Sequence, residues 1–383
     1  MSIRTVRFGI IGCGLMGREF ASVVGRWCHL LDLDVRPEIV AICDANPAAM
    51  EWFTKNFDIP KVTSDYTELL ANPDVDAVYC AVPHDLHERF YIDILKAGKN
   101  LFAEKPFGID LGACERIIGE VHAHPDLLVR CSSEFPFFPA ARRIVKMIEA
   151  GEFGQILEVR SGLYHSSDLD MQKPINWKRR IATCGEYGCL GDLGMHIVHI
   201  PIRAGWLAAN VRALLSDVVK ERPDGNGGMA PCETWDNAIL ACESVQGFPM
   251  ILETKRISPA DTNTWYLQIL GTRNSAEFST KHPKTLRTMP YRSGQPQTWH
   301  VEDIGYDTAY KTITGSIFEF GFSDAILQMW AAYVDELANG QDMVGRYRCA
   351  TPEEALESHH LFTAALESQK QCSTVKLRRA VLG

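Results

Sequence analysis

The chain lacks the features that place a protein in a membrane or on a nucleic acid. None of its apolar runs reaches the length of about 18 residues that a membrane-spanning helix needs. The opening residues, "MSIRTVRFGIIG", show no cleavable signal pattern, so we expect a cytoplasmic protein. The net charge is -9 and there is no basic stripe, which argues against nucleic acid or an anionic membrane as a partner. A small-molecule substrate fits this composition better.

Paired cysteine motifs are also absent. The sequence has 12 cysteines but no CxxC, and many of them stand within apolar segments, as Cys43, Cys80, Cys131 and Cys242 do. Free cysteine behaves as a small apolar residue, so this distribution predicts buried, reduced thiols. Internal repeats and low-complexity segments are absent as well.

A chain of 383 residues predicts two domains. The first third alternates short β-branched runs with helical patterns. The apolar runs lie at residues 6–12, 38–44, 75–83, 99–106 and 127–135. Unbroken apolar strands that alternate with helices are typical of a parallel sheet covered on both faces. We therefore predict a doubly wound Rossmann domain over residues 1–132.

The pattern changes after residue 132. Longer and partly alternating runs follow at residues 155–165, 210–221, 235–244, 248–258 and 265–279, and two helical patterns at 322–340 and 351–369. The turn-like sequences "SVQGF" and "GTRN" between runs favour antiparallel pairing. Residues 133–383 are therefore predicted to form an α+β domain on one large, mainly antiparallel sheet.

A glycine-rich turn follows the first predicted strand. "GIIGCGLMG" places Gly12, Gly14 and Gly17 in a GxGxxG pattern, with Leu15 and Met16 between the last two glycines. The first glycine permits the tight turn, the second lets a pyrophosphate approach the backbone, and the third lets helix and strand pack closely. The helix N-terminus then faces the phosphates, so the pattern predicts a dinucleotide site.

Asp44 ends the second predicted strand, where a carboxylate can accept hydrogen bonds from both hydroxyls of the adenosine ribose. The same charge would repel the 2'-phosphate of NADP, so we expect NAD. The separation from Gly14 exceeds the usual spacing of about 20 residues. We attribute the excess to a prolonged helix and loop over residues 25–38. A helix N-cap is the alternative role for Asp44.

The stretch "CLGDLGMHIVHI" contains Asp192, His196 and His199 at offsets of four and seven. In a helix these offsets place all three residues on one face. That face could hold acid/base groups, a metal ion bound by two histidines and one carboxylate, or only solvent. The stretch itself leaves these three readings open.

Four motifs together resemble one family. "FAEKPFG" at residues 102–108, the glycine turn, "AVPHDLH" at 81–87 and "GDLGMHIVH" at 191–199 occur in the order typical of the Gfo/Idh/MocA oxidoreductases, and the resemblance returns near the end at "TPEEALESHHLFTAALESQ". The resemblance implies a Rossmann domain with a bound nicotinamide nucleotide. It also implies a second domain with an open-faced sheet that builds homodimers or homotetramers, and sugars, glycosides, sugar nucleotides or polyols as substrates.

The resemblance also assigns roles. The lysine of the EKP motif corresponds to Lys105, and the D-x-G-x-H pair corresponds to Asp192 and His196. An imidazole suits proton abstraction from a hydroxyl near neutral pH, so His196 is the expected base. The cation of Lys105 would favour the developing alkoxide. Asp192 would orient the imidazole or bind a neighbouring hydroxyl.

The chain departs from the family at two histidines. His199 stands where many members have aspartate, and His84 stands where asparagine is common. We expect the cofactor side to include Gly12, Gly14, Leu15, Met16, Gly17, Asp44, Pro83, His84, His87, Glu104 and Lys105. The expected substrate side comprises Lys105, Tyr164, Trp177, Asp192, His196 and His199.

Three alternative functions remain open from the sequence. Asp192, His196 and His199 could form a metal centre of an unrelated enzyme. NAD could act transiently, oxidising a glycoside so that a substituent is eliminated, and then be regenerated. The chain could also bind nucleotide as a sensor without catalysis.

Overall fold

The computed structural model describes residues 3–305, 307–315 and 317–378. Its N-terminal part contains a six-stranded sheet in the order β3-β2-β1-β4-β5-β6, and every pairing in it is parallel. The strands are β1 (Arg4–Ile11), β2 (Val35–Cys43), β3 (Lys61–Thr63), β4 (Ala77–Cys80), β5 (Asn100–Ala103) and β6 (Val129–Cys131). The doubly wound prediction is confirmed. The short, half-exposed edge strand β3 has too few apolar residues to stand out as a run.

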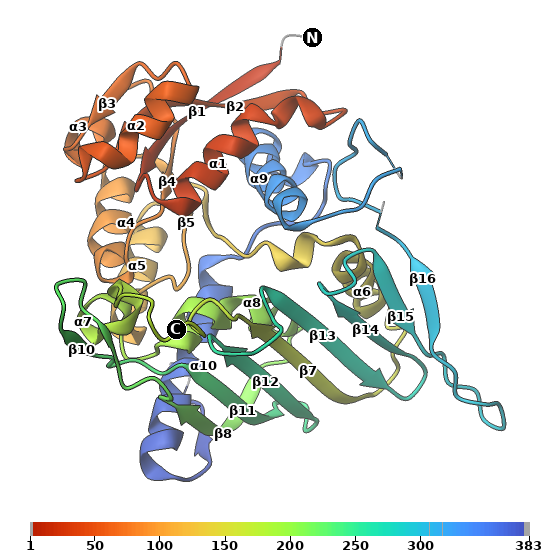
Figure 1. Cartoon of the computed structure of the whole chain (residues 1–383). Coiled ribbons are helices and arrows are strands. Elements are labelled where there is room, and N and C mark those ends of the chain that lie inside the picture. The colour runs from red at the N-terminus through yellow and green to blue at the C-terminus, as the bar shows by residue number, and fades with distance from the viewer. Residues whose placement is uncertain (1–2, 306, 316, 379–383) are drawn as a thin grey trace.

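Helices cover this sheet on both faces (Figure 1). They are α1 (Leu15–Gly25), α2 (Pro47–Asn56), α3 (Tyr66–Leu70), α4 (His87–Lys96) and α5 (Leu111–Ala123), with short 3-10 turns η1 (Trp27–His29) and η2 (His84–Leu86). Polar side chains start several of them: Asn46 accepts a hydrogen bond from the Ala48 amide at 3.1 Å, and Asp110 from the Ala113 amide at 2.7 Å. Because the strands are parallel, the loops after β1, β4 and β5 meet at one edge.

The segment between α1 and β2 differs from its expected form. The helix is not prolonged, because α1 ends at Gly25, and residues 35–38 belong to β2 instead of a loop. Val35 pairs with Arg4, so β2 runs beside the whole length of β1. The indole of Trp27 donates a hydrogen bond to the Val35 carbonyl at 2.9 Å and holds the turn against the strand. The excess spacing before Asp44 is therefore a 3-10 turn, a short loop and a long strand.

The second sheet has nine strands in the order β16-β15-β14-β13-β7-β12-β11-β8-β17, and all pairings are antiparallel except that of β7 with β12. The strands are β7 (Ile156–Tyr164), β8 (Ala208–Ser216), β11 (Asn237–Ser244), β12 (Pro249–Lys255), β13 (Thr264–Gly271), β14 (Ser275–Ser279), β15 (Thr285–Thr288), β16 (His300–Asp303) and β17 (Val375–Lys376), with a separate pair of β9 (Glu221–Pro223) and β10 (Met229–Pro231). The mainly antiparallel prediction is confirmed. The run 210–221 is shorter than expected, since β8 ends at Ser216.

Helix α8 (Cys189–Arg203) packs on one face of this large sheet, against β7, β11, β12 and β13. The chain between β6 and β8 also forms η3 (Phe135–Phe137), α6 (Pro139–Glu149), η4 (Trp177–Arg179) and α7 (Ile181–Cys184). The α8 segment is buried from Cys189 to Pro201. Its polar side chains Asp192, His196 and His199 are therefore enclosed by protein.

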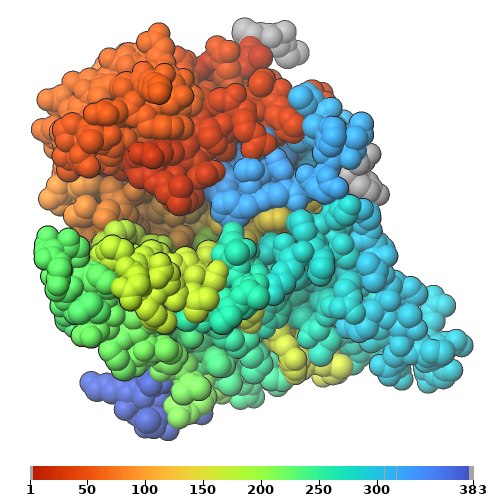
Figure 2. Space-filling view, in the orientation of Figure 1, coloured from red at the N-terminus to blue at the C-terminus, as the bar shows by residue number. Residues whose placement is uncertain are grey.

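The last helices connect the two sheets. Helix α9 (Phe322–Asn339) returns to the first sheet, where the ring of Trp330 stacks on Phe20 with centroids 3.7 Å apart. Figure 2 shows this blue segment packed against the red N-terminal part. After η5 (Gly340–Asp342), α10 (Pro352–Gln371) begins at a capping box formed by Thr351 and Glu354. The domain boundary between residues 132 and 133 stays a prediction. Helix α9 follows this boundary in the sequence but packs against the N-terminal part.

Candidate active site

A cleft of about 610 Å³ lies at the carboxyl ends of β1, β4 and β5, facing the start of α8. Eleven of the expected site residues line it: Gly12, Gly14, Leu15, Met16, Asp44, Pro83, His84, Glu104, Lys105, Trp177 and Asp192. They come from six separate stretches of the sequence. The fold thus brings most of the expected cofactor residues, and Lys105, Trp177 and Asp192 of the expected substrate side, to one place.

The glycine turn has the geometry that a dinucleotide requires. Gly12 has φ +99°, and a Cβ there would lie 2.3 Å from the Ala81 carbonyl oxygen. A Cβ on Gly17 would lie 2.3 Å from the Gly12 oxygen, so helix and turn are in close contact. By contrast, a Cβ on Gly14 would meet no atom within 4 Å. Open space beside Gly14, in front of the N-terminus of α1, suits a pyrophosphate.

Asp44 is held at the end of β2 by two backbone amides. Its carboxylate accepts hydrogen bonds from the Cys13 and Asn46 amides, both at 2.8 Å. Each oxygen keeps a further lone pair, and the side chain faces the cleft. The carboxylate is therefore oriented for hydroxyl groups. The helix N-cap is the next polar residue, Asn46, and not Asp44.

Lys105 reaches across the cleft from the loop after β5. Its Nζ donates to the Asp192 carbonyl oxygen at 2.8 Å and lies 3.3 Å from Oδ1 of the same residue. The peptide bond between Lys105 and Pro106 is cis. Burial lowers the pKa of Lys105, but the carboxylates of Asp192 and Glu104 outweigh it and keep the pKa above its ordinary value. The side chain is thus a cation fixed between the two halves of the site.

The Asp192 carboxylate forms ion pairs with three cationic side chains. Besides Lys105, the Nζ of Lys178 lies 2.9 Å from both carboxylate oxygens, and Nη2 of Arg256 lies 3.3 Å from Oδ2. Burial opposes ionisation, yet Lys178 and Lys105 hold the pKa of Asp192 well below its usual range. Asp192 therefore stays a carboxylate and holds cations in place. Its contacts are with these cations and not with the imidazole of His196.

His196 lies one helical turn after Asp192 and is only 3% exposed. Its Nδ1 is 3.6 Å from Oε2 of Glu134. Burial, and then the nearby Lys105 ammonium, lower the pKa of His196 well below its ordinary value. The indole of Trp265 donates to the His196 carbonyl at 3.0 Å and holds the backbone. The ring is therefore neutral near pH 7 and can accept a proton.

Besides His196, which is not among the residues that line the cleft, two expected substrate residues lie away from it. His199 is buried, and its Nε2 lies 3.6 Å from Oε2 of Glu354. It is far from the cleft because a helical rise of 1.5 Å per residue puts it about 10 Å along α8 from Asp192. The hydroxyl of Tyr164 donates to Glu253 at 2.5 Å, on the face of β7 opposite buried Leu163. Neither side chain belongs to the group around Lys105.

Two expected cofactor residues lie behind the cleft wall. Gly17 contacts the turn instead of the cavity. The ring of His87 is enclosed between the carbonyls of Pro106 at 2.7 Å and Val82 at 3.0 Å, and burial lowers its pKa to about 4. His87 therefore holds two cleft-forming loops together. His84 does face the cleft, with Nδ1 3.0 Å from the Cys184 carbonyl.

The contacts of Asp192, His196 and His199 do not support the hypothesis that these three residues bind a metal ion. Asp192 contacts cations, whereas His196 and His199 each face a different glutamate. Among the residues that the structure describes, no group of three or more His, Cys, Asp or Glu side chains is placed to hold a metal ion.

The tertiary structure adds charged residues to the expected set. Lys178 directly follows Trp177 in the sequence "NWKRR". Arg256 and Glu134 stand at the ends of apolar segments, and no motif marks them. At the Asp44 end, Tyr66 also lines the cleft and carries the guanidinium of Arg89 at 5.2 Å from its ring centroid.

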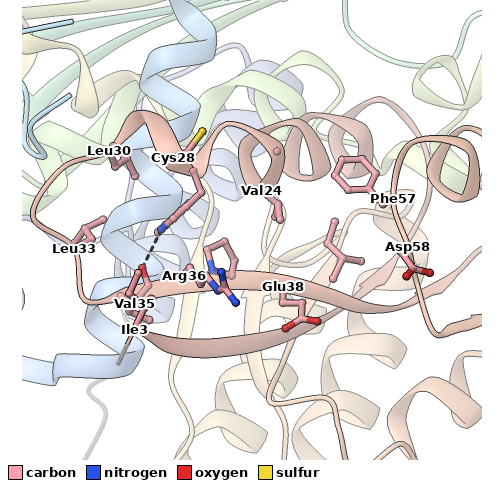
Figure 3. Close-up of a pocket in the computed structure, with 14 residues that line it drawn as sticks. Ile3, Val24, Cys28, Leu30, Leu33, Val35, Arg36, Glu38, Phe57 and Asp58 are labelled. Carbon is pink, nitrogen blue, oxygen red and sulfur yellow. Dashed lines mark hydrogen bonds between the residues drawn. The ribbon is translucent and has the colours of Figure 1, made fainter. Parts of the chain in front are cut away.

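A second hollow of about 500 Å³ lies between η1 and the first residues of β2 (Figure 3). It is at the amino end of β2, opposite the cleft, and the residues that line it include Cys28, Arg36 and Glu38. None of the expected site residues lines it.

The strand order, the glycine turn and the cleft define a dinucleotide-binding oxidoreductase fold. Residues 6–129 match the profile "Oxidoreductase family, NAD-binding Rossmann fold" (GFO_IDH_MocA), and residues 141–277 match the GFO/IDH/MocA C-terminal domain. The chain belongs to the Gfo/Idh/MocA family. The expected NAD-dependent oxidoreductase acting on CH–OH groups is thereby confirmed at the level of the family.

Named relatives are dehydrogenases. The levoglucosan dehydrogenase of Pseudarthrobacter phenanthrenivorans is 24% identical over 336 residues, covering 83% of each chain. The inositol 2-dehydrogenase of Acidothermus cellulolyticus is 30% identical over 154 residues, which are 40% of this chain and 43% of that protein.

Two solved structures show the same fold. A levoglucosan dehydrogenase in complex with NADH and L-sorbose superposes with a TM-score of 0.87 at 22% identity, covering 98% of this chain and 100% of the other. An NAD binding oxidoreductase from Klebsiella pneumoniae gives 0.88 at 20% identity with the same coverage. Among the residues described, no helix is long and apolar enough to cross a membrane.

Proposed function

We propose that the chain is an NAD-dependent dehydrogenase that oxidises a secondary hydroxyl of a sugar, a glycoside or a polyol. The observation that carries this proposal is the position of Lys105, whose Nζ is held by Asp192 in the same cleft that the glycine turn borders. The names of the levoglucosan and inositol dehydrogenases support the substrate class.

Lys105, Asp192 and His196 form the proposed catalytic group. The ammonium of Lys105 donates to the substrate oxygen and stabilises the alkoxide that develops on it. Asp192 fixes that ammonium and stays ionised. The neutral imidazole of His196 accepts the hydroxyl proton. NAD, when bound, supplies the hydride acceptor at its nicotinamide.

The cofactor would extend along the wall of the cleft. The glycine turn, with Gly14 in open space, would hold the pyrophosphate, and Asp44 would bind the ribose of the adenosine half. Leu15, Met16, Pro83, His84 and Glu104 are the remaining proposed cofactor contacts.

Trp177 is the proposed apolar surface for a sugar ring. Its indole lies in the cleft in an edge contact with His84, with ring centroids 4.8 Å apart, and Lys178 follows it. An aromatic face packs on the apolar side of a pyranose, while neighbouring cations bind its hydroxyls.

A panel of polyols, free sugars and glycosides incubated with NAD, followed by absorbance of reduced nicotinamide, tests the activity. Lys105→Ala should abolish turnover while NAD binding, measured by calorimetry, persists. Lys55→Ala, which removes an exposed lysine on α2, is the matched control and should behave as wild type. Normal turnover in Lys105→Ala would refute the assignment. Release of an aglycone without net NADH would indicate the redox-neutral route instead.

The preference for NAD over NADP is proposed to depend on Asp44. Asp44→Ala should weaken NAD binding and reduce the discrimination against NADP, because the anionic side chain that repels a 2'-phosphate is gone. An unchanged ratio of the two dissociation constants would remove Asp44 from that role. A cytoplasmic location and assembly into homodimers or homotetramers through the large sheet stay predictions.

A further inference from the structure

A glutamate outside the expected set lies beside the proposed base. Glu134 stands between β6 and η3, where the chain crosses from the first sheet to the second. It is 6% exposed, and its Oε2 is 3.6 Å from Nδ1 of His196. Within the described residues, Nδ1 of His196 is one of the buried side-chain atoms that have no hydrogen-bond partner, and Nε2 of the same ring is not one of them. A buried, unpartnered ring nitrogen therefore faces a buried carboxyl group.

We propose that Glu134 is a positioning residue for His196, an inference that rests on the proposed dehydrogenase function. The Glu134 carboxylate accepts a hydrogen bond from Nδ1–H, which fixes the tautomer that has Nε2 free. Nε2 then takes the proton from the substrate hydroxyl as the hydride leaves the carbon. The carboxylate next to Nδ1 stabilises the imidazolium so formed.

The distance supports this role. At 3.6 Å the pair is just beyond hydrogen-bond length, and such contacts often tighten when substrate binds. Leaving Nδ1–H unpaired in a buried site would be costly, and no other side chain in the described residues is bonded to it. The rings of Phe135 and His196 are in a T-shaped contact with centroids 5.1 Å apart.

The charges around the pair make the contact sensitive to pH. Burial raises the pKa of Glu134 to about 7, although the Lys105 ammonium acts in the opposite direction. The remaining groups that act on Glu134 or His196 are Glu104, Asp192, His165 and His199. Above about pH 7 the carboxylate is available to Nδ1–H, so sugar oxidation should rise as the pH increases through this region.

Steady-state kinetics on the sugar found in the panel test the role. Glu134→Ala should lower kcat by about 100-fold with little change in KM. Glu134→Gln keeps an acceptor for Nδ1–H but no charge, so it should lose about tenfold and abolish the rise in kcat near pH 7. Glu115→Gln, an exposed carboxyl on α5, is the control and should match wild type in rate and pH profile. Unchanged kcat and an unchanged pH profile in Glu134→Gln would overturn the proposal. This test stands even if Glu134→Ala fails to fold, because it uses Glu134→Gln alone.

A second measurement does not depend on activity. ¹⁵N-NMR of the histidine rings reports the tautomer, and the His196 signals are assigned by their loss in His196→Gln. The wild type should carry its proton on Nδ1, and Glu134→Ala should shift His196 to a mixture of tautomers. A tautomer that is the same with and without Glu134 would refute the contact. If the wild type oxidises no sugar, the proposed function fails, while the NMR result still decides whether Glu134 positions His196.

Discussion

Replacing Glu134 with glutamine should remove a pH dependence from the stability of the folded chain. Burial raises the pKa of this carboxyl from 4.5 to about 7. The pKa is higher in the folded state than in the unfolded state, so the protonated carboxyl contributes to the free energy of unfolding. This contribution is fully present below about pH 4.5 and is lost as the pH rises through about 7. The two values differ by about 2.5, and at about 1.4 kcal/mol per pKa unit the loss is about 3 kcal/mol.

Chemical denaturation at several pH values between about 4.5 and 8 measures this loss. The free energy of unfolding of Glu134→Gln, minus that of the wild type, should increase by about 3 kcal/mol across the range. Other titrating groups are common to both proteins and cancel. The control Glu115→Gln should show a constant difference, since that side chain is exposed. Parallel curves for wild type and Glu134→Gln would refute the reasoning that burial raises the pKa of this carboxyl in the folded chain.

Three further substitutions test the glycine turn and the excluded histidine. Gly14→Val places a side chain in open space, so NAD binding by calorimetry should weaken by at least about tenfold while the melting temperature changes little. Gly12→Ala adds a Cβ that would lie 2.3 Å from the Ala81 oxygen at φ +99°, and denaturation should show a loss of about 2 kcal/mol or more; a variant as stable as wild type would contradict the turn geometry. His199→Gln loses its contact with Glu354 and should cost about 1–3 kcal/mol, yet kcat/KM should stay within about threefold of wild type. A much larger loss of activity would return His199 to the site.

Much of the fold follows from local patterns in the chain. Apolar runs separated by helical patterns predicted the parallel sheet, and alternation with turn sequences predicted the antiparallel one. The helical pattern predicted at 351–369 matches α10, whose capping box at Thr351 is formed by residues close together in the sequence. The return of α9 to the first sheet had no such signal. Its packing depends on aromatic contacts between Trp330 and Phe20, which are about 310 residues apart.

The dinucleotide turn and the helix that carries Asp192 and His196 could be predicted from the sequence, because glycine spacing and helical periodicity are local properties. Which charged groups meet depends on the tertiary fold. Three cations from separate segments converge on Asp192, Glu134 reaches His196 from the crossing between the sheets, and His199 turns toward Glu354. Such electrostatic neighbours depend on contacts between distant segments, and no spacing along the chain encodes them.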